Sequence, residues 1–183
     1  MVEMQVTGLT IDPANNAPIV ILREKAGVRV LPIWIGVIEA SAIAFELEQV
    51  KLNRPMTHDL LKTCIELLGG RVDRIAIVDL KENTYFATVY LECQGRQVEL
   101  DARPSDAIAL GMRARAPILC AERVLAAAQA RQVSAAGAAP PETGVEDDRG
   151  DAGPRPLVLD PDQKFGLDLL ERLEPNAFGK YKM

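Results

Sequence analysis

The chain has 183 residues, of which 48% are hydrophobic, so it can form one ordinary domain with a core and some additional chain. Its formal net charge is −5 and only 4% of its residues are aromatic, which argues against a broad basic surface for duplex nucleic acid and against extensive base stacking. No apolar run approaches the roughly 20 residues of a membrane span. The N-terminus lacks the pattern of a signal peptide, so we expect a cytoplasmic protein that does not contact membranes.

The first third of the chain is typical of β-strands. Residues 2–11 alternate weakly between polar and apolar, and residues 18–24 and 28–35 are rich in β-branched side chains. The sequence PANN at 13–16 is typical of a turn. From residue 37 to about residue 50 the apolar period changes, which predicts a helix with a wide buried face.

The middle of the chain predicts two further helices and three strands. A second helix carries an apolar stripe made of Leu60, Leu61, Cys64, Ile65 and Leu68. Gly69 and Gly70 end this helix. Residues 71–80 and 84–93 then predict a hairpin, and residues 96–102 a further strand. A third helix begins near Ser105 and is apolar on nearly every side, so we expect it to be buried.

The last part of the chain divides into a short ordered stretch and a tail. Residues 117–120 predict a short strand and residues 121–130 a last helix. The predicted fold of residues 1–130 is therefore α/β (α+β), a compact mixed or antiparallel sheet with packed helices. Residues 131–155 are rich in Ala, Gly, Pro and acidic residues and predict a flexible linker. Residues 156–183 hold a short amphipathic segment that is too short to fold alone.

The cysteines argue against a disulfide framework and against a zinc site. Cys64, Cys93 and Cys120 are odd in number, far apart in the chain, and each lies in an apolar context. We therefore expect three buried, reduced thiols.

The stretch NRPMTHDLL holds the only histidine of the chain, His58. Because Pro55 disfavours helix before it, Thr57 is expected to cap a helix whose first turn contains His58 and Asp59. The partial positive charge of a helix N-terminus stabilises Asp59 and disfavours a protonated imidazole, so His58 can act as a general base. Arg54 precedes the helix. Lys62 follows one turn later, on the face of His58.

A similar stretch, ARPSDAIAL, occurs later in the chain. Here Ser105 is expected to cap the helix, with Asp106 in its first turn and Arg103 before it. Two helix N-termini with an arginine at each would form a good anion site if they converged. The alternative is that both stretches are helix-start signals, in which Arg103 pairs with Asp106 and Arg54 pairs with Asp59.

Acidic residues offer a possible site for a hard divalent cation such as Mg²⁺ or Mn²⁺. The candidate metal ligands are Glu39, Asp59, Asp79, Asp101 and Asp106. Their spacing matches no known metal-binding loop. The chain also lacks a Walker loop, a GxGxxG loop, a GxSxG elbow and an HExxH helix.

The chain resembles the bifunctional nuclease domain of bacteria and plants in three segments, PIWIGVIEASAIAFEL, RPMTHDLL and DARPSDAIALGMRARAPILC. The segments occur in this order, and the predicted hairpin lies between the last two. The resemblance covers roughly residues 2–130. It implies a compact α/β domain that forms oligomers and has RNase and DNase activity. The matched motifs contain Trp34, Gly36, Glu39, Arg54, Thr57, His58, Asp59, Asp101, Arg103, Ser105 and Asp106.

Two features depart from the family pattern. Met56 occupies a position where the family more often has leucine. Some relatives end in a helical pair similar to a motif of nucleotide-excision repair proteins, and residues 156–183 lack the core of that motif.

The leading hypothesis is a nuclease that acts on RNA or DNA. His58 would be the base, Arg54 and Arg103 would stabilise the developing phosphorane charge, and Asp59 or Asp106 would orient His58 or hold Mg²⁺ or Mn²⁺. Further residues expected to bind substrate are Thr57, Ser105 and Lys62.

Two other hypotheses remain open from the sequence. The first is a non-catalytic regulatory module that binds a phosphorylated or carboxylate ligand in the same arginine-lined site. The second is a purely structural role, in which the motifs only cap helices. All three are compatible with a homo-oligomer, most simply a dimer, because the apolar content exceeds what one small sheet must bury.

Overall fold

The computed structural model describes the backbone of residues 1–136 and the side chains of residues 1–130. The predicted tail at 156–183 lies outside the described residues, as does most of the predicted linker. The last helix continues to Ala136, six residues beyond its predicted end, into the segment predicted as linker. Alanine-rich sequence has a high intrinsic helix propensity, which explains this continuation.

Within residues 1–136, seven strands form one mixed sheet in the order β3-β2-β1-β7-β4-β5-β6. The strands are β1 (Val2–Ile11), β2 (Pro18–Glu24), β3 (Val30–Trp34), β4 (Gly70–Lys81), β5 (Thr84–Cys93), β6 (Arg96–Ala102) and β7 (Ile118–Cys120). β4 and β7 pair in parallel, whereas the other neighbours pair antiparallel. The predicted mixed sheet is therefore confirmed.

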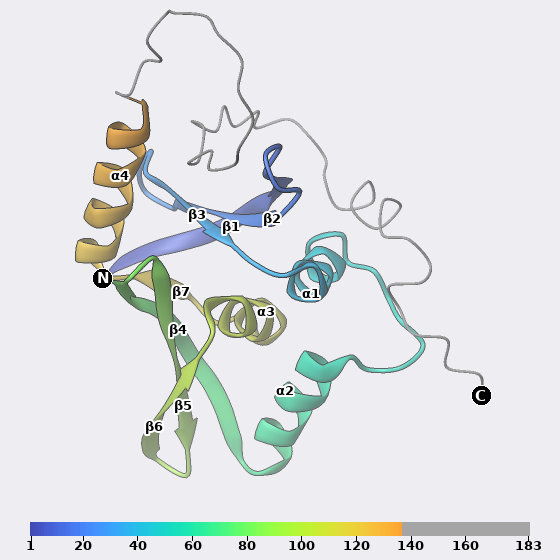
Figure 1. The fold of residues 1–183 in the computed structure, drawn as a ribbon. Coiled ribbons are helices and arrows are strands. Elements are labelled where there is room, and N and C mark those ends of the chain that lie inside the picture. The colour runs from blue at the N-terminus through green and yellow to red at the C-terminus, as the bar shows by residue number, and fades with distance from the viewer. Residues whose placement is uncertain (137–183) are drawn as a thin grey trace, which may run out of the picture.

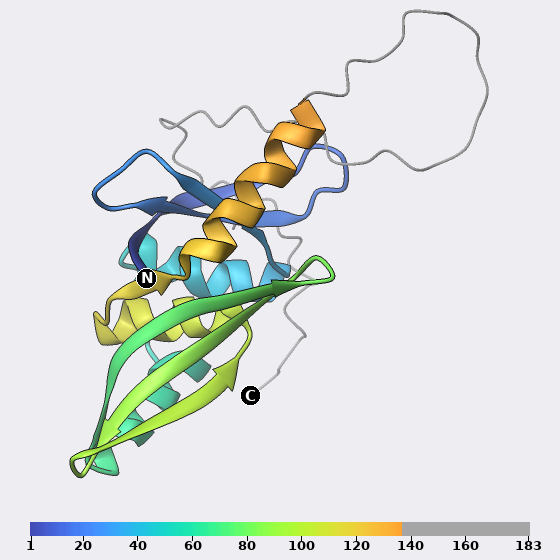
Figure 2. The same cartoon turned by 90° about the vertical axis from the view of Figure 1, so that its left-hand side faces the viewer.

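In the described part of the chain, four helices cover the two faces of this sheet. They are α1 (Val37–Leu47), α2 (Thr57–Leu67), α3 (Pro104–Ala114) and α4 (Glu122–Ala136). In both views α1, α2 and α3 lie on one face and α4 lies on the other (Figure 1, Figure 2). None of these helices is long and apolar enough to cross a membrane.

The core lies between the sheet and the helices on both sides. β2 is buried over its first five residues because helices cover the sheet on both faces at this point. Ile43 of α1, Ile75 and Ile77 of β4, and Ile108 of α3 are fully buried. The burial of α3 was predicted from its apolar sequence and is confirmed.

The apolar stripe of α2 faces solvent, unlike the apolar residues of α3. Three members of the stripe, Leu60, Leu61 and Leu68, are exposed by 56%, 45% and 74%, and α2 has no fully buried residue. Leu67, which lies beside the stripe, is exposed by 82%. Ile65 is the member of the stripe that packs against the core. The chain therefore displays an aliphatic surface on α2 that its own described residues do not cover.

The expectation of three buried thiols is wrong for two of the three cysteines. Cys64 lies on the exposed side of α2 and Cys93 is half-buried, whereas Cys120 is buried. All three are free thiols, so the predicted lack of disulfides is confirmed. Burial, with a smaller contribution from the charge of Glu122, raises the pKa of the Cys120 thiol to about 12.

Candidate functional site

The first turns of three helices carry acidic residues at equivalent positions. Glu39 in α1, Asp59 in α2 and Asp106 in α3 each lie three residues after the residue that caps the helix. A carboxylate at this position is stabilised by the positive end of the helix dipole. The sequence therefore places one negative charge at the N-terminus of each helix on this face of the sheet.

The helices begin one or two residues earlier than expected. Met56, not Thr57, caps α2, and Asp59 fixes this start because its Oδ2 accepts the Met56 N–H at 2.8 Å. Arg103, not Ser105, caps α3. Pro104 is the first helical residue because its fixed φ angle suits that position and its missing N–H costs nothing there.

A network of polar contacts joins the first turns of α1, α2 and α3. The Nε2 atom of His58 lies 3.3 Å from Oδ1 of Asp106, which links α2 to α3. Nε of Arg103 donates to Oδ2 of Asp106 at 2.7 Å, and its Nη1 lies 2.8 Å from Oε1 of Glu39 in α1. The two arginine-proline motifs therefore meet through His58 and Asp106, which are 48 residues apart in the sequence.

The electrostatics of this network keep Asp106 ionised. Partial burial alone would raise the pKa of the Asp106 carboxyl, but the hydrogen bonds and charge of Arg103, with a smaller contribution from His58, lower it below its usual value. An ionised Asp106 accepts a hydrogen bond from Nε2–H of His58. The Nδ1 atom of a neutral His58 is then free of a proton and can accept one.

Gly36 leaves room for the Glu39 side chain. Gly36 caps α1, and a Cβ atom placed on it would lie 2.2 Å from Oε2 of Glu39. Because Glu39 folds back over the start of its own helix, its carboxylate reaches Arg103. A glycine at this position therefore supports the contact between α1 and α3.

Asp59 faces a different partner from its neighbour His58. Its Oδ1 accepts a hydrogen bond of 2.8 Å from Nε of Arg113, near the end of α3. The Arg113 side chain is only 4% exposed, and its Nη1 also donates to the carbonyl of Ala109. Sequence analysis missed Arg113, although an arginine inside a helix that is otherwise apolar signals a buried ion pair.

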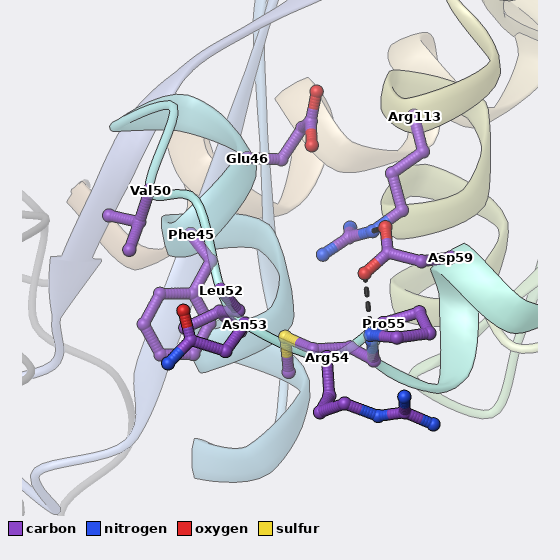
Figure 3. Close-up of a pocket in the computed structure, with 10 residues that line it drawn as sticks. Phe45, Glu46, Val50, Leu52, Asn53, Arg54, Pro55, Asp59 and Arg113 are labelled. Atoms are coloured by element: carbon purple, nitrogen blue, oxygen red, sulfur yellow. Dashed lines mark hydrogen bonds and ion pairs between the residues drawn. The ribbon is translucent and has the colours of Figure 1, made fainter.

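Asp59 and Arg113 line a pocket of about 330 Å³ between α1, α2 and α3. Figure 3 shows Phe45 and Glu46 entering it from the last turn of α1, with Arg113 on the opposite side. Arg54 belongs to the rim of this pocket, and its side chain points outward, toward solvent (Figure 3).

The different spacing of the two motifs explains the positions of their arginines. Arg103 comes three residues before Asp106 and forms an ion pair with it, whereas Arg54 comes five residues before Asp59. The predicted pairing of Arg103 with Asp106 is confirmed. The alternative pairing of Arg54 with Asp59 is not seen, because Arg113 occupies that carboxylate.

The remaining candidate residues lie around the network. Thr57 is exposed in the first turn of α2, whereas Ser105 is buried. Lys62 forms an ion pair of 3.7 Å with Glu66 in the same helix. Asp101 is exposed on β6, where it pairs with Thr88 of β5.

The candidate metal ligands, as they are placed, do not fit a divalent ion. Within the described part of the chain, no three His, Cys, Asp or Glu side chains gather closely enough to hold a metal. Arg103 contacts both Glu39 and Asp106, so a cation shared by these two carboxylates would have to displace its guanidinium. Asp79 lies on β4, where it forms an ion pair with Lys81.

Comparison with known proteins agrees with the motifs. Residues 20–132 match the family described as "Bifunctional nuclease domain". An uncharacterized protein of Mycobacterium tuberculosis is 43% identical over 128 residues, which are 70% of this chain and 76% of that protein.

Two plant proteins are more distant relatives. Bifunctional nuclease 1 of Oryza sativa subsp. japonica is 28% identical over 116 residues, which are 62% of this chain and 35% of the rice protein. Bifunctional nuclease 2 of Arabidopsis thaliana is 28% identical over 108 residues, which are 57% of this chain and 33% of that protein. The chain thus spans about a third of each plant protein. The match over residues 20–132 shows that the chain belongs to the bifunctional nuclease domain family.

Proposed function

We propose that the chain is a nuclease that cleaves phosphodiester bonds of RNA or DNA, with its catalytic centre at His58 and Asp106. The observation that carries this proposal is the contact between them at 3.3 Å, where the first turns of α2 and α3 meet. Family membership supports the reaction class, because the plant relatives are named as nucleases. Helix N-termini that converge favour binding of a phosphate.

His58 is the proposed general base. Asp106 accepts the Nε2–H hydrogen bond and orients the imidazole, so that Nδ1 can take a proton from water or from a 2′-hydroxyl group. The His58 side chain is 13% exposed, so a small part of the imidazole can be reached from solvent. In this assignment Asp106 is a positioning residue, whereas Asp59 acts on Arg113 instead.

Arg103 is the proposed stabiliser of negative charge on the reacting phosphate. Its side chain remains 66% exposed although it contacts Asp106 and Glu39, so its outer side is open to an anion. An arginine offers five N–H donors in a fork that suits phosphate oxygens. Arg54, Thr57 and Lys62 surround the start of α2 and are proposed to hold neighbouring parts of the substrate.

The metal requirement is a separate part of the proposal. Mg²⁺ or Mn²⁺ would supply Lewis acidity and charge neutralisation at a phosphate. The placement of Arg103 between the carboxylates does not favour such an ion, and no step of the proposed mechanism needs it. Cleavage measured with Mg²⁺, with Mn²⁺ and with EDTA determines whether a metal takes part.

A non-catalytic anion-binding module is the competing function. The observation that favours it is the 66% exposed side chain of Arg103, whose outer N–H groups can hold an anion without turnover. Incubation of the purified chain with labelled single-stranded RNA and with DNA of the same sequence separates the two functions. A nuclease forms shorter products. A binding module forms no products, and its free energy of unfolding rises by about 2.7 kcal/mol when the ligand concentration is a hundred times the dissociation constant.

We also propose that the chain forms a homo-oligomer, most simply a dimer, through α2 and β6. Cys93 Sγ lies 3.7 Å from the carbonyl of Leu68, so the end of β5 lies beside the end of α2. Val98 of β6 pairs with Leu91 of β5, and Leu100 pairs with Val89, so each lies on the same side of the sheet as its partner. The exposed fractions of Val98 and Leu100 are 41% and 44%.

A second copy of the chain is the proposed occupant of this surface because β6 is an edge of the sheet. Edge strands have free backbone groups on one side, and two antiparallel β6 strands can pair with each other. Sedimentation should give a dimer for the wild type and a monomer for Leu67→Glu. At a protein concentration of roughly 100 micromolar even a weak dimer should form, so a wild-type monomer under these conditions would contradict the proposal.

A further inference from the structure

The pocket beside Asp59 is distinct from the network around His58. It is lined by residues from the end of α1, from the segment between α1 and α2, and from Arg113 of α3 (Figure 3). His58, Arg103 and Glu39 are not among its lining residues. With a volume of about 330 Å³ it falls at the small end of the range for small-molecule sites.

The walls of the pocket combine an aromatic and aliphatic surface with an equal number of polar and charged side chains. The apolar part consists of Phe45, Val50, Leu52, Pro55 and Met56, and the polar part of Glu46, Asn53, Arg54, Asp59 and Arg113. Such a combination suits a flat, heteroaromatic ligand, because its faces need apolar contact and its edges need hydrogen bonds.

Glu46 carries the charge that a ligand must satisfy. The charge of Arg113 is balanced by Asp59 at 2.8 Å, whereas among the described residues the Glu46 carboxylate has only a long contact of 3.5 Å with the amide of Gln49. The pocket therefore favours a group with N–H donors. Arg113 lies on the opposite side, where its Nε and Nη1 already donate to Asp59 and to the carbonyl of Ala109.

We infer that this pocket binds a guanine base of the nucleic-acid substrate. Guanine is the base whose pairing edge presents two adjacent N–H donors beside a carbonyl oxygen. The carboxylate of Glu46 can accept from both donors. Adenine, cytosine and uracil present one donor group each on that edge and leave part of the carboxylate unsatisfied.

The position of the pocket connects it with the proposed reaction. Asp59 and His58 are consecutive residues, with Cα atoms about 3.8 Å apart, but they face different partners. Arg54 lies at the rim with its exposed side chain in solvent, and this side chain can turn toward a phosphate attached to a bound nucleoside. This inference rests on the proposed nuclease function and adds to it a preference for cleavage next to guanine.

The test measures binding of the four nucleoside monophosphates GMP, AMP, CMP and UMP to the full chain by calorimetry, in EDTA. GMP should bind at least about tenfold more tightly than the other three, as expected for a bidentate contact to one base. Glu46→Gln should remove this preference, because an amide cannot accept two hydrogen bonds from the same edge. Glu48→Gln is the matched control, since Glu48 is exposed at the end of the same helix and does not line the pocket.

A second variant tests the apolar wall. Phe45→Ala should weaken binding of all four nucleotides about tenfold, because base stacking tolerates any base. Thermal melting of each variant shows whether it is folded. Equal affinity for the four nucleotides, no measurable binding at millimolar concentration, or a GMP preference that persists in Glu46→Gln would each overturn the inference.

Cleavage assays on the same proteins separate this inference from the proposed function. If wild type binds GMP selectively but forms no product from RNA or DNA, the guanine pocket stands and the nuclease assignment fails. If wild type cleaves both polymers without any preference for guanine and binds the four nucleotides equally, the nuclease assignment stands and the guanine pocket fails.

Discussion

Asp59 and Arg113 form an ion pair of 2.8 Å between the first turn of α2 and the end of α3. Arg113 is buried, and the same carboxylate of Asp59 also accepts the N–H of Met56, which caps α2. The pair therefore fixes both the start of α2 and its position on α3. His58 is the residue before Asp59, so the pair also determines where the imidazole meets Asp106.

Asp59→Asn should lower the free energy of unfolding by about 2 kcal/mol, which is less than the roughly 3–5 kcal/mol for breaking a fully buried pair. The effect is smaller because Asp59 is 39% exposed, so water already weakens its attraction to Arg113, and because the Asn amide oxygen can still accept a hydrogen bond from Arg113. Urea unfolding at neutral pH measures the difference.

Glu66→Gln is the control for this change, because it removes the exposed ion pair with Lys62 in the same helix. Such a pair contributes less than about 0.5 kcal/mol. Equal stability of the two variants would show that the Asp59–Arg113 pair does not hold α2 in place.

Asp106 should make the stability of the chain sensitive to acid. The pKa of the Asp106 carboxyl is lower in the folded state than its unfolded value of about 3.9. The stability that this carboxylate contributes to the folded state is therefore present above the unfolded pKa and is lost as the pH falls through the folded pKa. Urea unfolding between pH 5 and pH 2 should show a smaller loss of stability for Asp106→Asn than for the wild type. Parallel curves for the two proteins would contradict this role of Asp106.

The three cysteines should differ in their reaction with a thiol reagent. Cys64 is exposed and should react first, whereas Cys120 is buried, with a thiol pKa raised to about 12, and should react only on unfolding. Kinetics of labelling in buffer and in urea, with Cys64→Ser to assign the fast phase, give the measurement. A fast phase that remains in Cys64→Ser would place the reactive thiol elsewhere.

Much of the fold could be predicted from local pattern. The predicted strands 2–11 and 18–24 agree with β1 and β2, because alternation and β-branched content indicate strands directly. The third strand is shorter than predicted, covering Val30–Trp34. The buried third helix was evident because apolar residues occupy nearly all of its sides.

The candidate site could be predicted only in part. The contact of Arg103 with Asp106 is local, with a separation of three residues, and was predicted. The link from Glu39 to Arg103 and the pair of Asp59 with Arg113 join distant residues, so their partners depend on how the helices pack. The exposure of the α2 stripe could not be predicted either. An apolar stripe has the same sequence pattern whether it packs against a core or against a partner.

Arg103→Ala should lower the rate of phosphodiester cleavage by a factor of about 10²–10³. This is the typical effect of removing one hydrogen-bond donor that points at the charge developing in the transition state. Arg123→Ala is a control, since Arg123 is an exposed arginine on α4, on the other face of the sheet. The rate at saturating substrate is the quantity to compare. A loss of only severalfold for Arg103→Ala would remove Arg103 from the catalytic centre.

The most direct test of the His58–Asp106 centre is single-turnover cleavage of labelled single-stranded RNA and DNA by wild type and His58→Ala, each purified identically. If His58 is the general base, cleavage follows the wild-type protein through purification, and the His58→Ala rate is at least about a hundredfold lower. Equal cleavage by both proteins would contradict the account and place the activity outside this site.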